Sequence, residues 1–228
     1  MVKQEITPQT TVLISDTAFF GKTYGMRVFR SPQLKRNLWR TEVSKEIMAT
    51  CYYGRKILED KGWRFTAVVV DGRRGMTAVF KNIPVQICQF HQMRTVTKHL
   101  TRRPETLAGQ DLRSIMLELP RSNEKDFTKL LSDWKKDWND LIAEKTYVSN
   151  TKYWHCTRKK VRGAYLSLER NLSYLFTCQK YPELHIPNTT NSLDGSFTRL
   201  KDKVNIHHGL RQDRHYKMIS EILGGGEK

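Results

Sequence analysis

The sequence predicts an α/β fold in which a mixed sheet is interrupted by a large helical insertion. The segments 11–15 and 63–71 contain the continuous apolar runs VLI and AVVV, which are typical of parallel strands buried on both faces. Two further strand-like segments, 19–30 and 34–43, lie between these runs and meet at a turn at Ser31 and Pro32. From about residue 104 to 186, apolar residues recur at helical spacing instead.

The remaining elements of the first half alternate between helix and strand. Apolar residues fall near helical spacing over 44–61, with Ser44 as the expected N-cap and Gly62 as the expected stop. We expect a strand at 63–71, a short helix at 75–82, a strand at 84–91 and a helix at 92–103. This order matches a ribonuclease-H-like sheet, in which the first and fourth strands lie side by side in parallel.

These patterns divide the chain into a core and an insertion. We expect residues 1–103 to form the first part of the core and residues 104–186 to form an all-helical insertion. Residues 187–223 return to the core with a helix that begins near Thr189, and residues 224–228 read as a flexible tail.

The composition indicates a basic protein that binds a negatively charged partner. The 228 residues include 40 Lys and Arg against 23 Asp and Glu, a net charge of +17, and nucleic acid is the usual ligand of such a field. A merely soluble basic protein, or one that meets an acidic protein or a membrane, is the alternative. No apolar run reaches the length of about 18 residues that a membrane span needs. The N-terminus shows no secretory signal and the four cysteines form no CxxC pair, so we expect a reduced, cytoplasmic protein.

Two predicted parallel strands each lead into an aspartate. Asp16 follows the apolar run in TVLISDTAFFG, and Asp71 follows the run in VVVDGRRG. Because ligands gather at the carboxyl ends of such strands, we expect both carboxylates at one edge of the sheet. Two-metal phosphoryl transfer needs such a cluster, and Asp194 in NTTNSLDGSF is the candidate third acid. Each aspartate taken singly also reads as a strand end, a turn residue or a helix-start residue.

A second constellation is Cys88 and His91 in CQFHQM. The pair could form half of a zinc site with His155 and Cys156, but the spacing is poor for a structural zinc site. We favour a local role, in which His91 contacts a scissile phosphate or positions a carboxylate. A polar residue at a strand end is the simplest alternative.

These motifs together resemble the DDE transposases of bacterial insertion sequences, of the Mutator-like type. The similarity rests on SDTAFFG, VVVDGRRG, CQFHQM, with the Cys-x-x-His pattern of that family, and IPNTTNSLDGSFTRLK. The segment YWHCTRKKVRGAYLSLERNL is similar to the late part of the family's insertion. The resemblance covers roughly residues 11–217.

The resemblance implies a transposase catalytic domain that cleaves transposon ends and joins the freed 3′-OH to target DNA. It implies that Asp16, Asp71 and Asp194 hold two Mg²⁺ or Mn²⁺ ions, with His91 as a further catalytic residue. It also implies action as a homo-oligomer on transposon ends and target DNA. The residues expected to contact DNA are Arg73, Arg74, Cys88, Asn191, Lys201, Arg158, Lys159 and Lys160.

The chain departs from the family pattern in two places. Family members usually have glutamate where this chain has Asp194, and Glu169 is the fallback third acid. The chain also starts almost directly at the first strand, without the usual end-recognition region. We therefore expect a catalytic fragment, a truncated open reading frame or a decayed copy.

Two aromatic residues next to a basic run, Tyr153 and Trp154, have two interpretations. They stack on an unpaired base, or, as we favour, they pack in the core of the insertion. Two alternatives to the transposase function stay open. One is a structure-selective nuclease on the same fold, and the other is a non-catalytic DNA-binding remnant.

Overall fold

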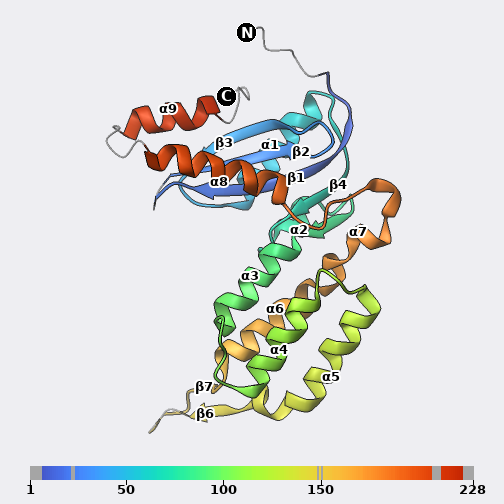
Figure 1. Ribbon diagram of the computed structural model, residues 1–228, viewed down its shortest axis with the longest axis vertical. Coiled ribbons are helices and arrows are strands. Elements are labelled where there is room, and N and C mark those ends of the chain that lie inside the picture. Colours follow the sequence, from blue (N-terminus) through green and yellow to red (C-terminus); the bar gives the residue numbers. More distant parts are fainter. Residues whose placement is uncertain (1–6, 22–23, 148, 150, 207–211, 223–228) are drawn as a thin grey trace.

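The computed structural model describes residues 7–21, 24–147, 149, 151–206 and 212–222, so the expected tail at 224–228 lies outside the described residues. The molecule is elongated, with a sheet at one end and a group of helices at the other (Figure 1). The predicted α/β class is confirmed, since a five-stranded mixed sheet carries helices on both faces.

The sheet has the strand order β3-β2-β1-β4-β5. β2 is antiparallel to both β1 and β3, whereas β4 is parallel to both β1 and β5. The predicted parallel pairing of the first and fourth strands is therefore confirmed. The strands are β1 (Thr10–Phe19), β2 (Gly25–Ser31), β3 (Arg36–Val43), β4 (Arg64–Val70) and β5 (Val85–Ile87).

Two predicted strand ends and one predicted strand start are wrong. The strand predicted over 19–30 is β2, which begins only at Gly25, because Phe19 belongs to β1. β1 does not end at Asp16 but continues to Phe19, because it pairs with β2 over that whole length. Its parallel pairing with β4 stops at Ile14, so Asp16 lies just beyond the last β1–β4 pair. β5 ends at Ile87 instead of residue 91, and helix α3 (Gln89–Leu100) begins almost at once. His91 therefore lies in the first turn of a helix.

Alternate residues of the strands pack on opposite faces of the sheet, as the two-residue period requires. Leu13 and Phe29 belong to the hydrophobic cluster that includes α1 (Met48–Asp60). Ile14 and Val28 belong to the cluster that includes α8 (Asn191–Ile206) and α9 (Gln212–Ile222). Asp16 shares the parity of Ile14, so its side chain lies on the α8 side.

The start of α1 differs from the prediction, and its end agrees with it. Ser44 is not the N-cap, because the helix begins at Met48 with Ile47 in an extended conformation before it. Gly62 follows the helix with a φ of 94°, the left-handed conformation expected of a glycine stop. The short helix predicted over 75–82 is α2 (Met76–Val79).

The helical part contains the predicted helices and one element that was not expected. Trp134 stacks on Tyr165 with ring centroids 5.2 Å apart, and its Nε1 donates to the carbonyl of Ala108. The insertion is not all-helical, since two short antiparallel strands form a hairpin in it. The elements are α4 (Leu107–Glu118), α5 (Glu124–Ala143), β6 (Lys145–Tyr147), β7 (Trp154–Cys156) and α6 (Lys159–Leu175).

Buried amide side chains tie the returning chain to the sheet. Gln86 and Gln89 both donate from Nε2 to the carbonyl of Leu175, at 2.9 and 3.0 Å. The backbone N–H of Gln89 donates to the carbonyl of Asn188 at 2.9 Å. The chain passes through α7 (Thr177–Lys180) and a 3-10 turn (Pro182–Leu184) between these anchors. As a result, α8 starts beside the end of β5.

The described residues show neither a membrane-spanning helix nor a disulfide bond. None of the described helices is both long and apolar enough to cross a bilayer. All four cysteines are free, and two of them, Cys51 and Cys88, are buried. These two thiols take part in the polar contacts of the site and its surroundings.

Candidate carboxylate–histidine site

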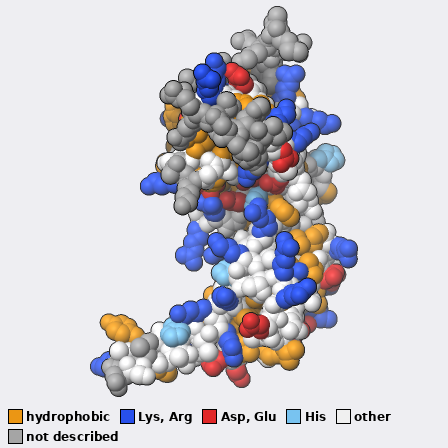
Figure 2. Space-filling model, turned by 60° about the vertical axis from the view of Figure 1, so that its left-hand side comes forward, with side chains coloured by type: hydrophobic (Ala, Val, Ile, Leu, Met, Phe, Trp, Pro, Cys, Tyr) orange, Lys and Arg blue, Asp and Glu red, His pale blue; other side chains and the backbone are white. Residues whose placement is uncertain are grey.

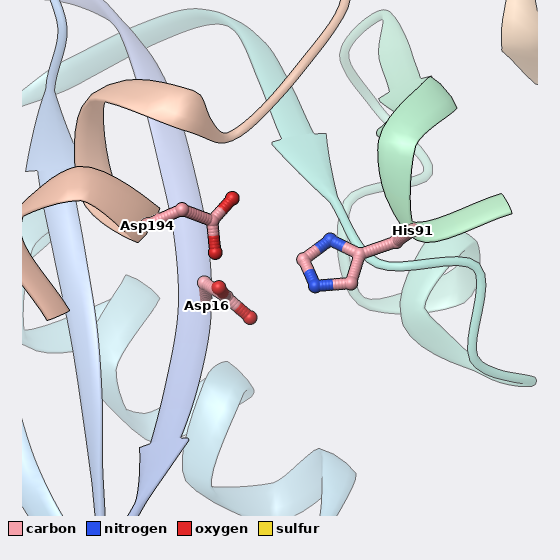
Figure 3. Close-up of side chains that lie close together, drawn as sticks. All are labelled: Asp16, His91 and Asp194. Atoms are coloured by element: carbon pink, nitrogen blue, oxygen red, sulfur yellow. The ribbon is translucent and has the colours of Figure 1, made fainter. Parts of the chain in front are cut away.

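Three side chains from distant parts of the sequence meet beside the sheet. Asp16 comes from β1, His91 from α3 and Asp194 from α8. One ligand atom of each lies within 4.8 Å of the others. Figure 3 shows the imidazole ring of His91 facing the two carboxylates, which lie next to each other.

Asp16 is buried, with 7% of its surface exposed. Its Oδ1 accepts a hydrogen bond of 2.8 Å from the backbone N–H of Thr17. Ile14 and Ala18, which share its face of β1, are also buried. A carboxylate in such an apolar setting needs protonation or a positive partner, because burial disfavours its charged form.

Asp194 lies in the first turn of α8, as predicted. The N–H groups of Leu193 and Asp194 both donate to the carbonyl of Thr190, which starts the helix. The hydroxyl of Thr190 donates to Asp194 Oδ2 at 2.6 Å. Leu193 is fully buried on the sheet and fixes the rotation of α8 that brings Asp194 to Asp16.

Cys88 and Thr190 hold the position of His91. The backbone N–H of Thr190 donates to Cys88 Sγ at 3.3 Å, and Thr190 Oγ1 lies 3.4 Å from His91 Nδ1. Cys88 is fully buried, so the prediction that it contacts DNA is wrong. The zinc alternative is also unsupported, because His155 and Cys156 lie on β7, in the hairpin between α5 and α6, and do not join His91 in the described cluster.

The protonation of the site follows from burial and close charges. Burial raises the pKa of Asp16 to about 7; His91 opposes this shift, and the charge of Asp194 adds to it. Burial alone would lower the pKa of His91, but Cys88, Asp16 and Asp194 raise it to about 9. Burial raises the pKa of the Cys88 thiol, yet hydrogen bonds from His91 and Thr190 outweigh it and the pKa is lowered. At neutral pH, His91 is therefore an imidazolium that compensates the carboxylates.

Asp71 is not part of this group. It follows β4, and its Oδ2 lies 3.1 Å from Nε of Arg73. Its charge still reaches Asp16 and contributes to the raised pKa of that carboxyl. The structure therefore brings together Asp16, His91 and Asp194, while Asp71 lies nearby and pairs with Arg73.

Glu46 connects Asp71, through Arg73, to the protein interior. The sequence patterns did not identify Glu46 as part of the site. Its Oε2 pairs with Arg73, and its Oε1 lies 3.2 Å from Arg27, whose side chain is 2% exposed. Arg27 also donates to Ser15 Oγ and Cys51 Sγ. The sequence shows Arg27 within a predicted strand, but it identifies neither the burial of that charge nor the acid that pairs with it.

The expected DNA-contacting residues fall into two separate places. Arg73 and Arg74 are exposed after β4, and Asn191 and Lys201 are exposed on α8. The run Arg158, Lys159 and Lys160 is exposed at the start of α6. This run borders the C-terminal end of α3, whereas His91 lies near its N-terminal end. The 12 residues of α3 span about 18 Å between these ends.

The fallback acid Glu169 lies in a different environment. Its Oε1 accepts from the hydroxyl of Tyr165 at 2.6 Å and pairs with Lys135 at 3.2 Å. It lies on α6 and takes no part in the carboxylate–histidine group. The geometry therefore supports Asp194 over Glu169 as the acid that joins Asp16.

The donor set suits a divalent cation that accepts both oxygen and nitrogen ligands. Mg²⁺ and Mn²⁺ both suit carboxylate oxygen ligands, so the two carboxylates fit either ion, and the imidazole of His91 does not distinguish between them. Binding through His91 requires loss of its proton. A second ion would need another carboxylate, and Asp71 is the nearby candidate. Neither a scan against models of known protein families nor a search of curated proteins found a match to this chain.

Proposed function

We propose that this chain is a metal-dependent phosphoryl-transfer enzyme that acts on DNA, the catalytic domain of a Mutator-like DDE transposase. One observation carries the proposal. Asp16 and Asp194, from opposite ends of the sequence, meet with His91 on one side of the sheet. Clustered carboxylates that can hold divalent ions are what such chemistry requires.

The topology supports the ribonuclease-H-like form of this proposal. Three antiparallel strands precede two parallel ones, and β1 and β4 lie side by side. One acid lies on β1, one directly after β4 and one on a helix that follows the inserted helices. This is the arrangement that the resemblance of the sequence to DDE transposases implies.

The residues of the site would share the work as follows. Asp16 and Asp194 would hold the cation through their carboxylate oxygens. A divalent cation bound there would activate water or a 3′-OH as the nucleophile and neutralise charge on the scissile phosphate. The protonated ring of His91 would donate a hydrogen bond to a phosphate oxygen. Asp71 would join as a further ligand once its carboxylate leaves Arg73.

DNA as the substrate is supported by charge. The net charge of +17 favours a polyanion, and the exposed Arg74, Asn191 and Lys201 follow or share the elements that carry the acids. We expect the enzyme to act as a homo-oligomer that holds transposon ends and target DNA together, in the cytoplasm with the nucleoid.

A strand-transfer assay tests this function. The protein is incubated with a pre-cleaved transposon-end duplex, taken from the sequence that flanks the gene, and supercoiled plasmid in Mn²⁺. We expect joined product with the wild type and none with Asp16→Ala or Asp194→Ala. Glu169→Ala is the matched control and should retain joining, because this acid lies outside the group. Joining that survives Asp16→Ala would refute the proposal.

A second candidate is a nuclease on the same fold that uses water alone, since the same carboxylate cluster would serve either nucleophile. Such an enzyme would nick plasmid DNA in Mn²⁺ and lose this activity with Asp16→Ala, but would never join a 3′-OH end. DNA binding that persists in EDTA, without nicking or joining by any variant, would instead indicate a non-catalytic remnant.

A further inference from the structure

A two-stranded hairpin projects from the end of the helical part that lies farthest from the sheet (Figure 1). Its strands, β6 and β7, lie between α5 and α6. Figure 2 shows it as an arm with hydrophobic side chains near its tip and Lys, Arg and His side chains around it. The carboxylate–histidine site makes no use of this hairpin.

One face of the hairpin carries exposed aromatic rings. Tyr147 lies directly opposite Trp154, so the two side chains share a face. Tyr147 is 67% exposed, Trp154 is 48% exposed and the adjacent Tyr153 is 78% exposed. The core packing that we favoured for Tyr153 and Trp154 is therefore wrong. The Nζ atom of Lys145 lies 4.2 Å from the centroid of the Trp154 ring, which places a cation on the aromatic face.

The hairpin also borders a basic pocket of about 460 Å³. His155 lines it and alternates with Trp154 along β7, so the pocket lies on the other face of the hairpin. Arg158, Lys159 and Lys160 line the same pocket, and Glu105 is its acidic lining residue. Glu144 lies 3.7 Å from Arg158 and offsets part of that charge. The excess of cations favours an anionic ligand such as a phosphate group.

We propose that the hairpin and this pocket form a binding site for single-stranded DNA, separate from the carboxylate–histidine site. Unpaired bases stack on Tyr147 and Trp154, and Lys145 moves from the Trp154 ring to a backbone phosphate. The strand then continues around the edge of the hairpin to the cations of the pocket on its other face. Proteins that bind single strands combine these two features, a cationic surface and exposed rings. In a duplex the base faces are already stacked on each other, so the exposed rings should add little to the affinity for a duplex. The choice of DNA over RNA rests on the proposed function, whereas the binding itself does not.

Fluorescence anisotropy with labelled oligothymidylate, in EDTA, tests the aromatic part. We expect the double variant Tyr147→Ala/Trp154→Ala to bind at least about tenfold more weakly. Trp154→Phe should bind nearly as well as the wild type, because the ring is kept. The matched control is Tyr52→Ala/Tyr53→Ala, which removes two exposed rings from α1 and should leave the affinity unchanged.

The salt dependence of the same binding tests the cations. Each lost phosphate contact should lower the slope of log affinity against log salt by about 1. Lys159→Gln/Lys160→Gln should therefore flatten the slope, while Lys125→Gln/Lys129→Gln on α5 should not.

Several outcomes would overturn the proposal. Equal affinity of the wild type and the Tyr147→Ala/Trp154→Ala variant for oligothymidylate would do so. A loss of duplex binding as large as the loss of single-strand binding would also do so, and tighter binding of oligouridylate would reject DNA as the ligand. If the double variant abolished self-association but kept DNA binding, the arm would be a protein interface. Because the assay is run in EDTA, a failure of catalysis leaves its outcome unaffected.

Discussion

At the scale of single residues, Asp16 is an ionisable group in a buried, largely apolar environment. It is nearly fully buried, and its compensation comes from His91 while Asp194 repels it. Burial disfavours the anion of such a carboxyl, and a bound divalent cation would stabilise that anion further. A carboxylate cluster in which one carboxyl has a raised pKa has the properties expected of a functional site.

The raised pKa of Asp16 predicts a pH-dependent stability difference. Between its ordinary pKa of 3.8 and the raised value of about 7, the folded chain binds more protons at Asp16 than the unfolded chain does. The contribution of Asp16 to the free energy of unfolding therefore falls as pH rises through this window. Asp16→Asn removes this loss, so its melting temperature relative to the wild type should increase from about pH 4 to pH 7.

Calorimetry without divalent ions at several pH values measures this difference. Asp140→Asn, an exposed carboxylate on α5, is the matched control and should show a difference that stays flat over the same window. A flat profile for Asp16→Asn as well would contradict the raised pKa.

The contacts of Asp194 predict how a longer side chain at this position would change metal binding. Asp194 already receives the hydroxyl of Thr190 at 2.6 Å and lies within reach of Asp16 and His91. A glutamate would push its carboxylate past Thr190 and lose that hydrogen bond. We therefore expect Asp194→Glu to bind Mn²⁺ more weakly, by roughly tenfold for a loss of about 1.4 kcal/mol.

Calorimetric titration with Mn²⁺ measures this affinity, with Glu169→Asp as the control outside the site. Tighter Mn²⁺ binding by Asp194→Glu would instead show that the natural aspartate is too short.

At the scale of elements, a buried ion pair joins β2 to the segment before α1. Arg27 on β2 and Glu46 have side chains only 2% and 4% exposed. Glu46 also holds Arg73, which in turn holds Asp71. The network therefore connects the inside of the sheet to the acid that follows β4, and it sets the position of that acid.

This network predicts a large cost when one partner is neutralised. Glu46→Gln leaves the charge of Arg27 buried without compensation, which should destabilise the fold by about 3–5 kcal/mol in urea unfolding. The control is Glu59→Gln, which removes the i,i+4 pair with Arg55 on α1 and should cost less than about 1 kcal/mol because Glu59 is partly exposed. Equal effects of the two variants would show that Arg27 finds other compensation.

At the scale of the whole molecule, the site exists because the last segment of the chain returns to the first strand. Gln86, Gln89 and the backbone around Leu175 and Asn188 form the hydrogen bonds that close this return. The helices between α3 and α7 form one continuous hydrophobic cluster with a face of the sheet. The inserted helices are therefore packed on the core, and their far end carries the hairpin.

The sequence by itself determined the elements whose signals are local. Continuous apolar runs identified β1 and β4, the three-strand meander followed from Ser31–Pro32 and the spacing of the strands, and the helical period identified the helical part. The position of Asp194 in the first turn of α8 also followed from local signals near Thr190. Backbone period and turn chemistry depend on neighbours in sequence, so they can be read without the fold.

Only the tertiary structure decided which polar groups meet. The sequence placed Asp71 beside Asp16 and His91 at a strand end, yet Asp71 pairs with Arg73 and His91 lies on α3. Glu46 and the exposed face of the β6–β7 hairpin had no local signal strong enough to predict them. Contacts of this kind depend on where strand pairing stops, how a helix is rotated and which charges are buried together. Packing between segments far apart in the chain sets these three features. Patterns of neighbouring residues in the sequence therefore do not predict them.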